Sequence, residues 1–504
     1  MAAILLPVVY LVIRAFSGNS SLWELVLRPR NLEILWNSLV LAFSVTLASI
    51  ALALPLAWLT TRTDLPYKRS WALLTALPLV IPSYIGAYLF VSAMGPRGLV
   101  QGWLEVLFGI ERLPSLYGFP GAVYVLTLLT YPYILLSLRA ALVGMDPAIE
   151  EAARSLGRTP WQTFWHVTLP QLRPALAAGS LLVILYTLRD FGAVAILRYN
   201  TFTRAIYVQY QSSLDRSAAA ALSLILILLT LILLALETRT QIATRQDSAN
   251  PRVRPPAIVS LGKWKWPALL FCGAVSLAAL FLPAVNLGYW LVRGLQAGER
   301  ISSLWGASWN SLSVSLIAAL VTVIASIPIS ILRVRRAGKY LLILERVTYL
   351  GFALPGIVIA LALVFFGANY TPFLYQTAPM LIFAYLVLFL PQALGAVQAS
   401  LLTVHPNLEE AGRSLGKGPL EVFRRITLPL VRPGLGAGMA LVFLTVMKEL
   451  PATLILSPLG FKTLATSVWG AVSEAFFARA AAPALLLILV SSVPMALLTI
   501  RKQI

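Results

Sequence analysis

Runs of about 20 apolar residues recur along this chain of 504 residues, and they constrain its fold more than any other feature. A run of that length crosses the hydrocarbon core of a bilayer as one helix. Charged residues make up 12% of the chain, whereas soluble domains carry about 25%, and the mean hydropathy is +0.83. Period-two alternation, the pattern of a transmembrane barrel, is absent. The sequence therefore predicts an all-α integral membrane protein.

About twelve spans are predicted, in two sets of six. They are residues 1–16, 36–60, 71–94, 118–140, 174–197 and 218–236, then 267–292, 309–332, 347–366, 379–402, 433–457 and 479–500. The polar, proline-containing segment between the sets predicts a solvated linker. The expected organisation is a first six-span half at 1–236, a linker at 237–266 and a second half at 267–504. The first run lacks a basic region before it and is interpreted as a span, not as a signal peptide.

A charged motif interrupts each half. Residues 150–157 read Glu-Glu-Ala-Ala-Arg-Ser-Leu-Gly, and residues 409–416 read Glu-Glu-Ala-Gly-Arg-Ser-Leu-Gly, 259 positions later. Leu-Pro follows each copy, at 169–170 and at 428–429. Each copy predicts an amphipathic helix, a glycine that ends it, and a second short helix that Leu-Pro stops.

The residue types at each position favour this helical interpretation. Asp146 and Pro147 supply a cap and a proline for the first turn of a helix, and carboxylates in that turn favour the positive end of the helix dipole. The glycine permits the left-handed conformation that commonly ends a helix. The residues concerned are Glu150, Glu151, Ala152, Ala153, Gly157, Leu169 and Pro170 in the first copy, and Glu409, Glu410, Ala411, Gly412, Gly416, Leu428 and Pro429 in the second.

Further matches extend the internal repeat beyond the charged motif. Trp-Asn-Ser-Leu occurs at 36–39 and again at 309–312. Prolines recur at equivalent places, with Pro132 paired to Pro391. Because six spans is an even number, the two halves are expected to have the same orientation and to be related by an axis along the membrane normal. A substrate pathway is expected between them.

The placement of the charges predicts the orientation. The formal net charge is +20, but the lysines and arginines lie in short loops beside apolar runs and form no stripe or recognition motif for nucleic acid. The dense clusters at 62–69 and 333–339 lie on the side of the two charged motifs and the linker. By the positive-inside rule that side, with both termini, is the cytoplasm.

The charged motif resembles the cytoplasmic signature of ABC importer permeases: Glu-Ala-Ala, three residues, Gly, nine residues, Ile or Val, one residue, Leu-Pro. The departures are Gly412 for the second alanine and Val167 for the isoleucine. The resemblance implies a type I importer permease fold in a bacterial inner membrane. It also implies that residues 146–172 and 405–431, hereafter the first and second coupling loops, each dock one copy of an ABC ATPase subunit.

The chain shows no P-loop of its own. Its Gly-Lys pairs, at 262–263, 338–339 and 416–417, lack the upstream glycine and the following Ser or Thr that phosphate and magnesium binding need. The chain is therefore expected to be a transport subunit and not an enzyme, with no cofactor bound by itself. ATP would be used by the partner.

Fused permeases of this kind resemble the binding-protein-dependent ferric iron transporters. The similarity is sharpest at residues 447–454 and 460–466. The resemblance implies that an extracytoplasmic binding protein delivers ferric iron to the permease. Thiamine, polyamine and sulfate permeases are related alternatives. A secondary transporter driven by an ion gradient is an alternative from another class, although it leaves the repeated charged motif without a use.

Two charged pairs lie inside predicted spans, Arg189-Asp190 and Lys448-Glu449. An ionisable residue there costs about 2.5–3.5 kcal/mol on insertion scales and usually marks a pathway or finds a partner. Carboxylates also suit a hard cation. We hypothesise that these four residues line or gate the substrate path. Salt bridges between the halves, for example Arg189 with Glu449, are the structural alternative.

No metal site is predicted. His166 and His405 do not recur at equivalent positions of the two halves, so both are interpreted as loop or cap residues. Cys272 is the single cysteine, which excludes an internal disulfide.

Overall fold

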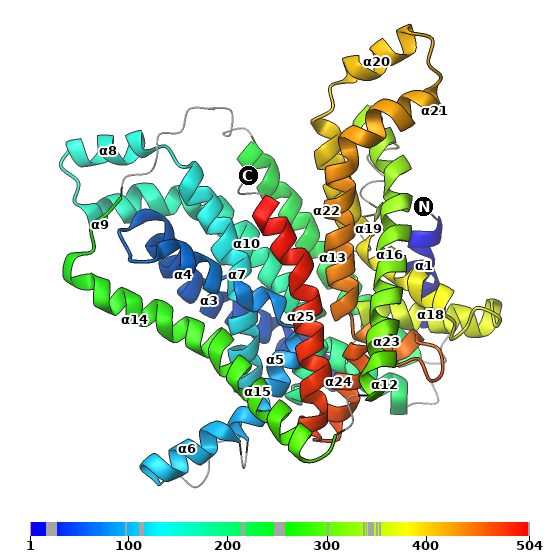
Figure 1. Ribbon diagram of the computed structural model, residues 1–504, viewed down its shortest axis with the longest axis horizontal. Coiled ribbons are helices and arrows are strands. Elements are labelled where there is room, and N and C mark those ends of the chain that lie inside the picture. The colour runs from blue at the N-terminus through cyan, green and yellow to red at the C-terminus, as the bar shows by residue number, and fades with distance from the viewer. Residues whose placement is uncertain are drawn as a thin grey trace. The chain divides into compact units, whose positions relative to one another are not determined.

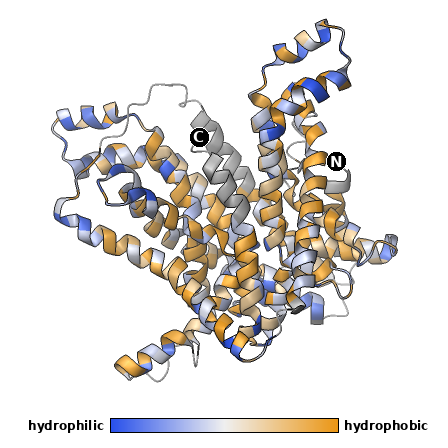
Figure 2. Ribbon diagram, viewed as in Figure 1, coloured by the Kyte–Doolittle hydropathy of each residue, from blue (hydrophilic) through white to orange (hydrophobic). Residues whose placement is uncertain are grey.

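The computed structural model describes residues 2–16, 28–95, 98–109, 115–212, 217–245, 258–299, 302–335, 338, 340, 347–348, 351 and 354–501. Within these ranges the regular structure is helical, apart from one isolated bridge between Thr63 and Val259. Figure 1 shows the long helices that make up most of the chain, and Figure 2 shows that their residues are mainly apolar. The predicted all-α membrane class is confirmed.

The chain divides into two compact units that interleave the sequence halves. One unit consists of Met1–Arg28, Ala205–Ile227 and Leu291–Ile504, and is called the C-unit here. The other consists of Pro29–Arg204 and Leu228–Trp290, and is called the N-unit. Helix α1 (Ala2–Phe16) thus belongs with the second half, where it packs on α18 (Gly356–Tyr370). Helix α14 (Lys265–Ser276) packs in turn with the first half.

The core of the N-unit is a trio of long helices: α3 (Pro29–Arg62), α7 (Phe119–Gly144) and α10 (Leu169–Arg189), each packed against the other two. The C-unit repeats it with α16 (Ser302–Arg335), α19 (Ala378–Leu402) and α22 (Leu428–Lys448). A proline lies inside every one of these helices. In the middle helix of each trio it is buried, as Pro132 and Pro391, because neighbouring helices shield the weakened turn.

Shorter helices complete the two units. The N-unit has α4 (Lys68–Leu74), η1 (Leu77–Val80), α5 (Ser83–Met94), α6 (Leu99–Phe108), α11 (Gly192–Ile196), η3 (Gly262–Trp264) and the π-helix η4 (Leu277–Phe281). The C-unit has α23 (Pro451–Leu456), α24 (Leu464–Ser473) and α25 (Phe477–Arg501). Three helices run from one unit into the other: α12 (Phe202–Ser212), α13 (Ser217–Arg245) and α15 (Leu282–Gln296).

The serine of the repeated Trp-Asn-Ser-Leu stretch accepts a hydrogen bond from the start of another helix in both units. The Ser38 hydroxyl on α3 accepts a hydrogen bond of 3.2 Å from the backbone N–H of Phe202, the first residue of α12. The Ser311 hydroxyl on α16 accepts one of 2.7 Å from the backbone N–H of Leu464, the first residue of α24. Each serine satisfies an N–H that a helix start leaves without an intrahelical partner.

The helices overlap most of the predicted spans, but the number of twelve is not confirmed, and part of the predicted span 347–366 lies outside the described residues. Among the described residues, seven helices are long and apolar enough to cross a membrane, and a bent pair adds an eighth. Shorter apolar helices lie near three further predicted spans, at Ala218–Leu233, Gly356–Tyr370 and Phe477–Ser492. The predicted span 1–16 contains α1, which is 15 residues long. The predicted spans 71–94, 174–197 and 433–457 are not single helices. The first bends by 98° at a break, and the other two end at Arg189 and Lys448.

Candidate functional site

The two coupling loops contain the same three elements in the same order. The first runs through α8 (Pro147–Ser155), α9 (Pro160–Thr163) and the π-helix η2 (Phe164–Thr168). The second runs through α20 (Pro406–Ser414), α21 (Pro419–Val422) and the π-helix η5 (Phe423–Thr427). Figure 1 shows each set beyond the ends of the long helices of its unit, and Figure 2 shows hydrophilic residues gathered there.

The first helix of each loop begins and ends as its sequence predicts. The Asp146 carboxylate accepts a hydrogen bond of 3.0 Å from the Ala148 N–H, and His405 Nδ1 accepts one of 3.3 Å from the Asn407 N–H. The glycines that end α8 and α20 have φ of 85° at Gly157 and 77° at Gly416. Other residues adopt this left-handed conformation at a cost, so glycine suits both positions.

The prediction that Leu-Pro stops the second short helix is wrong in both loops. Pro170 and Pro429 lie in the first turns of α10 and α22, and the chain enters these helices directly from η2 and η5. A proline interrupts the hydrogen-bond ladder of a continuous α-helix. A π-helical turn before it changes the local hydrogen bonding, so that the helix continues with its proline in a tolerated position.

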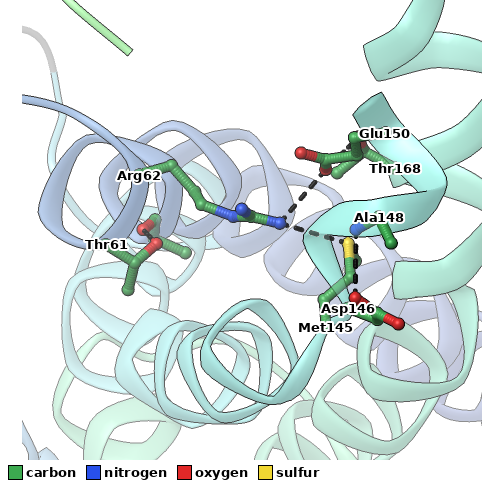
Figure 3. A network of polar contacts seen from close by, with 8 residues as sticks. Thr61, Arg62, Met145, Asp146, Ala148, Glu150 and Thr168 are labelled. Atoms are coloured by element: carbon green, nitrogen blue, oxygen red, sulfur yellow. Dashed lines mark hydrogen bonds and ion pairs between the residues drawn. The ribbon is translucent and has the colours of Figure 1, made fainter. Parts of the chain in front are cut away.

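An anchor of three residues fixes the first coupling loop to its unit (Figure 3). The Glu150 carboxylate accepts hydrogen bonds from Arg62 Nη2 at 3.1 Å and from the Thr168 hydroxyl at 2.8 Å. Arg62 is the last residue of α3, and its side chain is only 1% exposed. The same guanidinium nitrogen lies 3.3 Å from the Met145 sulfur. Glu150 therefore ties α8 to the ends of two long helices.

The second coupling loop has an equivalent anchor. The Glu409 carboxylate accepts hydrogen bonds from Arg335 Nη2 at 3.1 Å and from the Thr427 hydroxyl at 2.9 Å. Arg335 Nη2 also donates to the Val404 carbonyl at 3.0 Å. The sequence indicated the two glutamates but not their arginine partners. Arg62 lies 88 residues from Glu150, and Arg335 lies 74 residues from Glu409. Position 62 and position 335 match at the spacing of the Trp-Asn-Ser-Leu repeat, which is the signal that could have found them.

The second glutamate of each pair faces outward. Glu151 and Glu410 are exposed, as are the alanines that follow them, Ala152 and Ala411. Exposed apolar side chains adjoin them at equivalent positions, Ile149 and Leu156 in the first loop, Leu408 and Leu415 in the second, with Trp161 and Leu420 on the next helices. Outward carboxylates beside unburied leucines and a tryptophan are typical of a surface that binds another protein.

Each of the two departures from the signature removes a methyl group from the same contact, one in each loop. A Cβ added at Gly412 would come within 2.6 Å of Ile426 Cδ1. The first loop has Ala153 at the equivalent position, and there Val167, which has no δ-methyl, replaces the isoleucine. Each contact therefore contains one of the two methyl groups: the Cβ of Ala153 in the first loop and the Cδ1 of Ile426 in the second. Both loops keep a small residue where the first helix meets the π-helix.

The predicted charged pairs lie at breaks of the helices that follow the coupling loops. Helix α10 ends at Arg189, and the chain turns at Asp190 before α11. The Asp190 carboxylate is buried and accepts hydrogen bonds from the N–H groups of Ala193 at 3.0 Å and Val194 at 3.4 Å. The Ser83 hydroxyl, at the start of α5, also bonds to this carboxylate.

Glu449 occupies the equivalent break in the C-unit. Helix α22 ends at Lys448, and Glu449 Oε1 accepts a hydrogen bond of 3.3 Å from the Ala452 N–H in α23. The same oxygen lies against Gly356, the first residue of α18, where a Cβ would collide with it. Each acid therefore lies where the starts of two helices converge. The cross-half pairing of Arg189 with Glu449 joins the two units and stays a prediction.

The described residues contain no group of three or more His, Cys, Asp and Glu side chains placed to hold a metal ion. His405 caps α20, and His166 Nδ1 lies 3.0 Å from the Gln162 carbonyl one turn earlier. Both histidines therefore have the local roles predicted for them.

Comparison with known proteins identifies the family. Residues 35–241 and 323–502 match the family described as binding-protein-dependent transport system inner membrane component. The chain belongs to this family. The two matched segments contain both coupling loops and both helix breaks, and the predicted ABC importer permease is confirmed. This chain is a multi-pass inner-membrane transport subunit and not an enzyme, which removes the ion-gradient alternative.

Individual relatives refine the comparison. An Fe(3+)-transport system permease protein, FbpB 2 of Haemophilus influenzae, is 35% identical over 98% of this chain and 95% of its own length. A ferric transport system permease protein, FbpB of Actinobacillus pleuropneumoniae, is 26% identical over 84% of this chain and 64% of its own. The molybdenum permease ModB of Escherichia coli K12 is 32% identical over 36% of this chain and 83% of its own. A solved bacterial ABC transporter that imports alginate aligns with 48% of this chain and 89% of its own, with a TM-score of 0.39 and 20% identity.

Proposed function

We propose that this permease carries ferric iron, delivered by an extracytoplasmic binding protein, across the inner membrane. The observation that supports this substrate is the 35% identity to the Haemophilus Fe(3+) permease over nearly the full length of both chains. An independent argument for an importer driven by a partner comes from the two coupling loops, whose anchors recur and whose outer residues are left exposed.

Each coupling loop docks one ABC ATPase subunit in this proposal. The exposed glutamates, Glu151 and Glu410, supply charge for pairing, and the leucines beside them supply apolar area that a partner would bury. The anchors at Glu150 and Glu409 then transmit movement of the ATPase to the long helices. Both loops and both termini lie on the cytoplasmic side, as the positive-inside rule predicts.

The helix breaks border the translocation path in this proposal. Broken helices commonly form substrate sites near the middle of a transporter. Because backbone N–H groups already bind the Asp190 and Glu449 carboxylates, the acids act first by holding each break in place. Asp190→Asn and Glu449→Gln keep the size of the side chain but weaken the hydrogen bonds to its oxygens. Uptake should fall at least tenfold in the double variant, with normal membrane level and ATPase binding; unchanged uptake refutes this role.

The substrate is tested with the reconstituted complex in proteoliposomes. ATP hydrolysis should rise several-fold with the iron-loaded binding protein and stay at its basal rate with thiamine, a polyamine or sulfate supplied on their own binding proteins. Stimulation by an oxyanion instead of iron would favour the molybdenum and sulfate permeases, which match about a third of this chain. The same preparation tests docking, because Leu156→Asp with Leu415→Asp should release the ATPase during purification.

A further inference from the structure

A groove on the N-unit lies apart from the coupling loop and the helix break, between the last turns of α3 and the start of α14. Its volume is about 410 Å³, which falls in the range of about 300–1,000 Å³ typical of ligand sites. Helix α3 contributes Ala51 and Pro55 to its lining, and the other wall consists of Leu261, Trp264, Ala268 and Phe271. Every lining side chain is apolar.

Side-chain size explains why the groove exists. Ala51 and Pro55 lie one turn apart on one face of α3, and Trp264, Ala268 and Phe271 follow one face of the facing helix. The two alanines and the proline are short, so they leave space that a packed interior would fill. Ala51 and Pro55 are exposed. The groove is therefore open along one side, at the apolar surface of a membrane protein.

Polar contacts join one end of the groove, at residues 259–265, to the end of α3. This end is called the mouth of the groove. The Asp64 carboxylate accepts a hydrogen bond of 2.9 Å from the Leu261 N–H and lies 2.8 Å from Lys265 Nζ. The Val259 N–H donates to the Arg62 carbonyl at 2.8 Å. Because Arg62 also binds Glu150, the mouth lies at the membrane end that carries the first coupling loop.

Basic and aromatic side chains lie on the segment that forms this mouth. Lys263 is exposed between the lining residues Leu261 and Trp264, and Lys68 and Arg69 begin α4 on the same end of α3. Lys265 pairs with Asp64, so Lys263 is the exposed cation between the lining residues that this carboxylate does not neutralise. Trp264 and Trp266 are 73% and 79% exposed, as tryptophans at a membrane–water interface commonly are.

We propose that this groove binds a phospholipid with an anionic headgroup. One acyl chain lies along Ala51, Pro55 and Ala268, and the headgroup phosphate lies at Lys263. Apolar grooves that end in basic residues at the cytoplasmic side of membrane proteins bind anionic lipids in this way. A bound lipid would stabilise the end of α3, from which Arg62 holds the first coupling loop. The lipid would therefore act on the first coupling loop, in the N-unit.

Native mass spectrometry of the full chain in detergent tests the proposal, with phosphatidylglycerol or phosphatidylethanolamine added at equal concentration. The unsubstituted chain should retain phosphatidylglycerol several-fold better. Ala51→Trp fills the groove from an exposed position and should abolish the difference. Leu47→Trp is the matched control, because it adds the same side chain one turn away on α3, exposed and outside the lining, and should leave retention unchanged.

The headgroup contact is tested separately with Lys263→Gln, an exposed substitution that leaves the interior intact. This variant should bind both lipids equally. Equal retention of the two lipids by the unsubstituted chain would overturn the proposal, and so would full retention of phosphatidylglycerol by folded Ala51→Trp. Should Ala51→Trp fail to fold by circular dichroism, an unchanged lipid preference in Lys263→Gln would overturn it alone.

Discussion

The two coupling loops share their anchors but stabilise their second helices by different means. In the first loop a capping box joins Thr159 and Gln162, and the ring of Phe164 packs edge-on against Trp58 of α3, with centroids 5.1 Å apart. The second loop has Gly418 at the cap position without a side-chain hydrogen bond. There Glu421 pairs with a cation one turn before it and another one turn after it.

This contrast separates the contacts that both coupling loops share, which are the anchors, from the contacts of the second helix, which differ between the loops. The anchor glutamate, its arginine and its threonine recur because each loop must be fixed to the ends of two long helices. The outer surface of the second helix has no such constraint, so an aromatic cluster and a set of charges serve equally to hold it. In the proposed complex, an ATPase subunit would therefore meet a different outer surface on each coupling loop.

The largest expected effect is loss of an anchor. Arg62→Met leaves the Glu150 carboxylate without its cation, and removing one partner of a buried pair costs about 3–5 kcal/mol. Arg335→Met should cost less, about 2 kcal/mol by the same reasoning, because the Arg335 side chain is 16% exposed and that of Arg62 only 1%. The free energy of unfolding, measured in mixed micelles with a graded denaturing detergent, checks both values. A negligible loss in either variant would show that the anchors are not equivalent.

The second prediction tests the contact between position 412 and the δ-methyl group of Ile426. Gly412→Ala forces Ile426 to move, and overpacking of this kind costs about 1–3 kcal/mol. Adding Ile426→Val removes the colliding methyl and makes this contact resemble that of the first loop, so the double variant should recover to within about 0.5 kcal/mol of the unsubstituted chain.

The matched experiment runs in the other direction. Ala153→Gly with Val167→Ile converts the first loop to the packing of the second and should also be tolerated, whereas Val167→Ile alone should be destabilising. Additive losses in the two double variants would contradict the compensation, and unfolding midpoints of all variants decide between these outcomes.

How far the sequence could predict this arrangement depends on how local each feature is. The starts of α8 and α20 and their closing glycines follow from neighbouring residues, and the 259-residue repeat relates the two loops. Nothing local distinguishes Glu150 from Glu151, because they are adjacent carboxylates in the same short helix. Their difference arises from Arg62, which lies 88 residues from Glu150.

The helix breaks show the same limit. Residues 174–197 and 433–457 have the hydropathy of continuous spans, and their charged pairs predicted a pathway. Asp190 and Glu449 accept hydrogen bonds from the backbone of the helices that follow them, and the pathway stays a prediction. An apolar window reports the environment of a segment, but it does not report where the chain turns inside that environment.

A third prediction concerns the capping box. Thr159→Ala removes the hydroxyl that accepts a hydrogen bond of 3.2 Å from the Gln162 N–H, at a cost of about 1 kcal/mol. Gly418→Thr offers the missing hydroxyl to the second loop and should leave stability unchanged or raise it slightly. Amide hydrogen exchange over α9 and α21 checks both, with faster exchange expected in Thr159→Ala. Equal exchange before and after that substitution would show that the aromatic cluster alone holds α9.

The smallest expected effect is the response of the second loop to acid and salt. A hydrogen bond from Lys417, with the charges of Lys417 and Arg425, lowers the pKa of Glu421 below its usual value. The ion pairs of Glu421 therefore contribute fully above the pKa of the unfolded chain, and the contribution is lost as the pH falls through the lowered pKa of the folded chain. Because the groups are exposed, salt should weaken the pairs in the same way. As the pH falls, amide hydrogen exchange in α21 should become faster in the unsubstituted chain than in a Glu421→Gln variant. In α9 the ratio of the two exchange rates should not change with pH. A response of equal size in both helices would place its origin in the shared anchors instead.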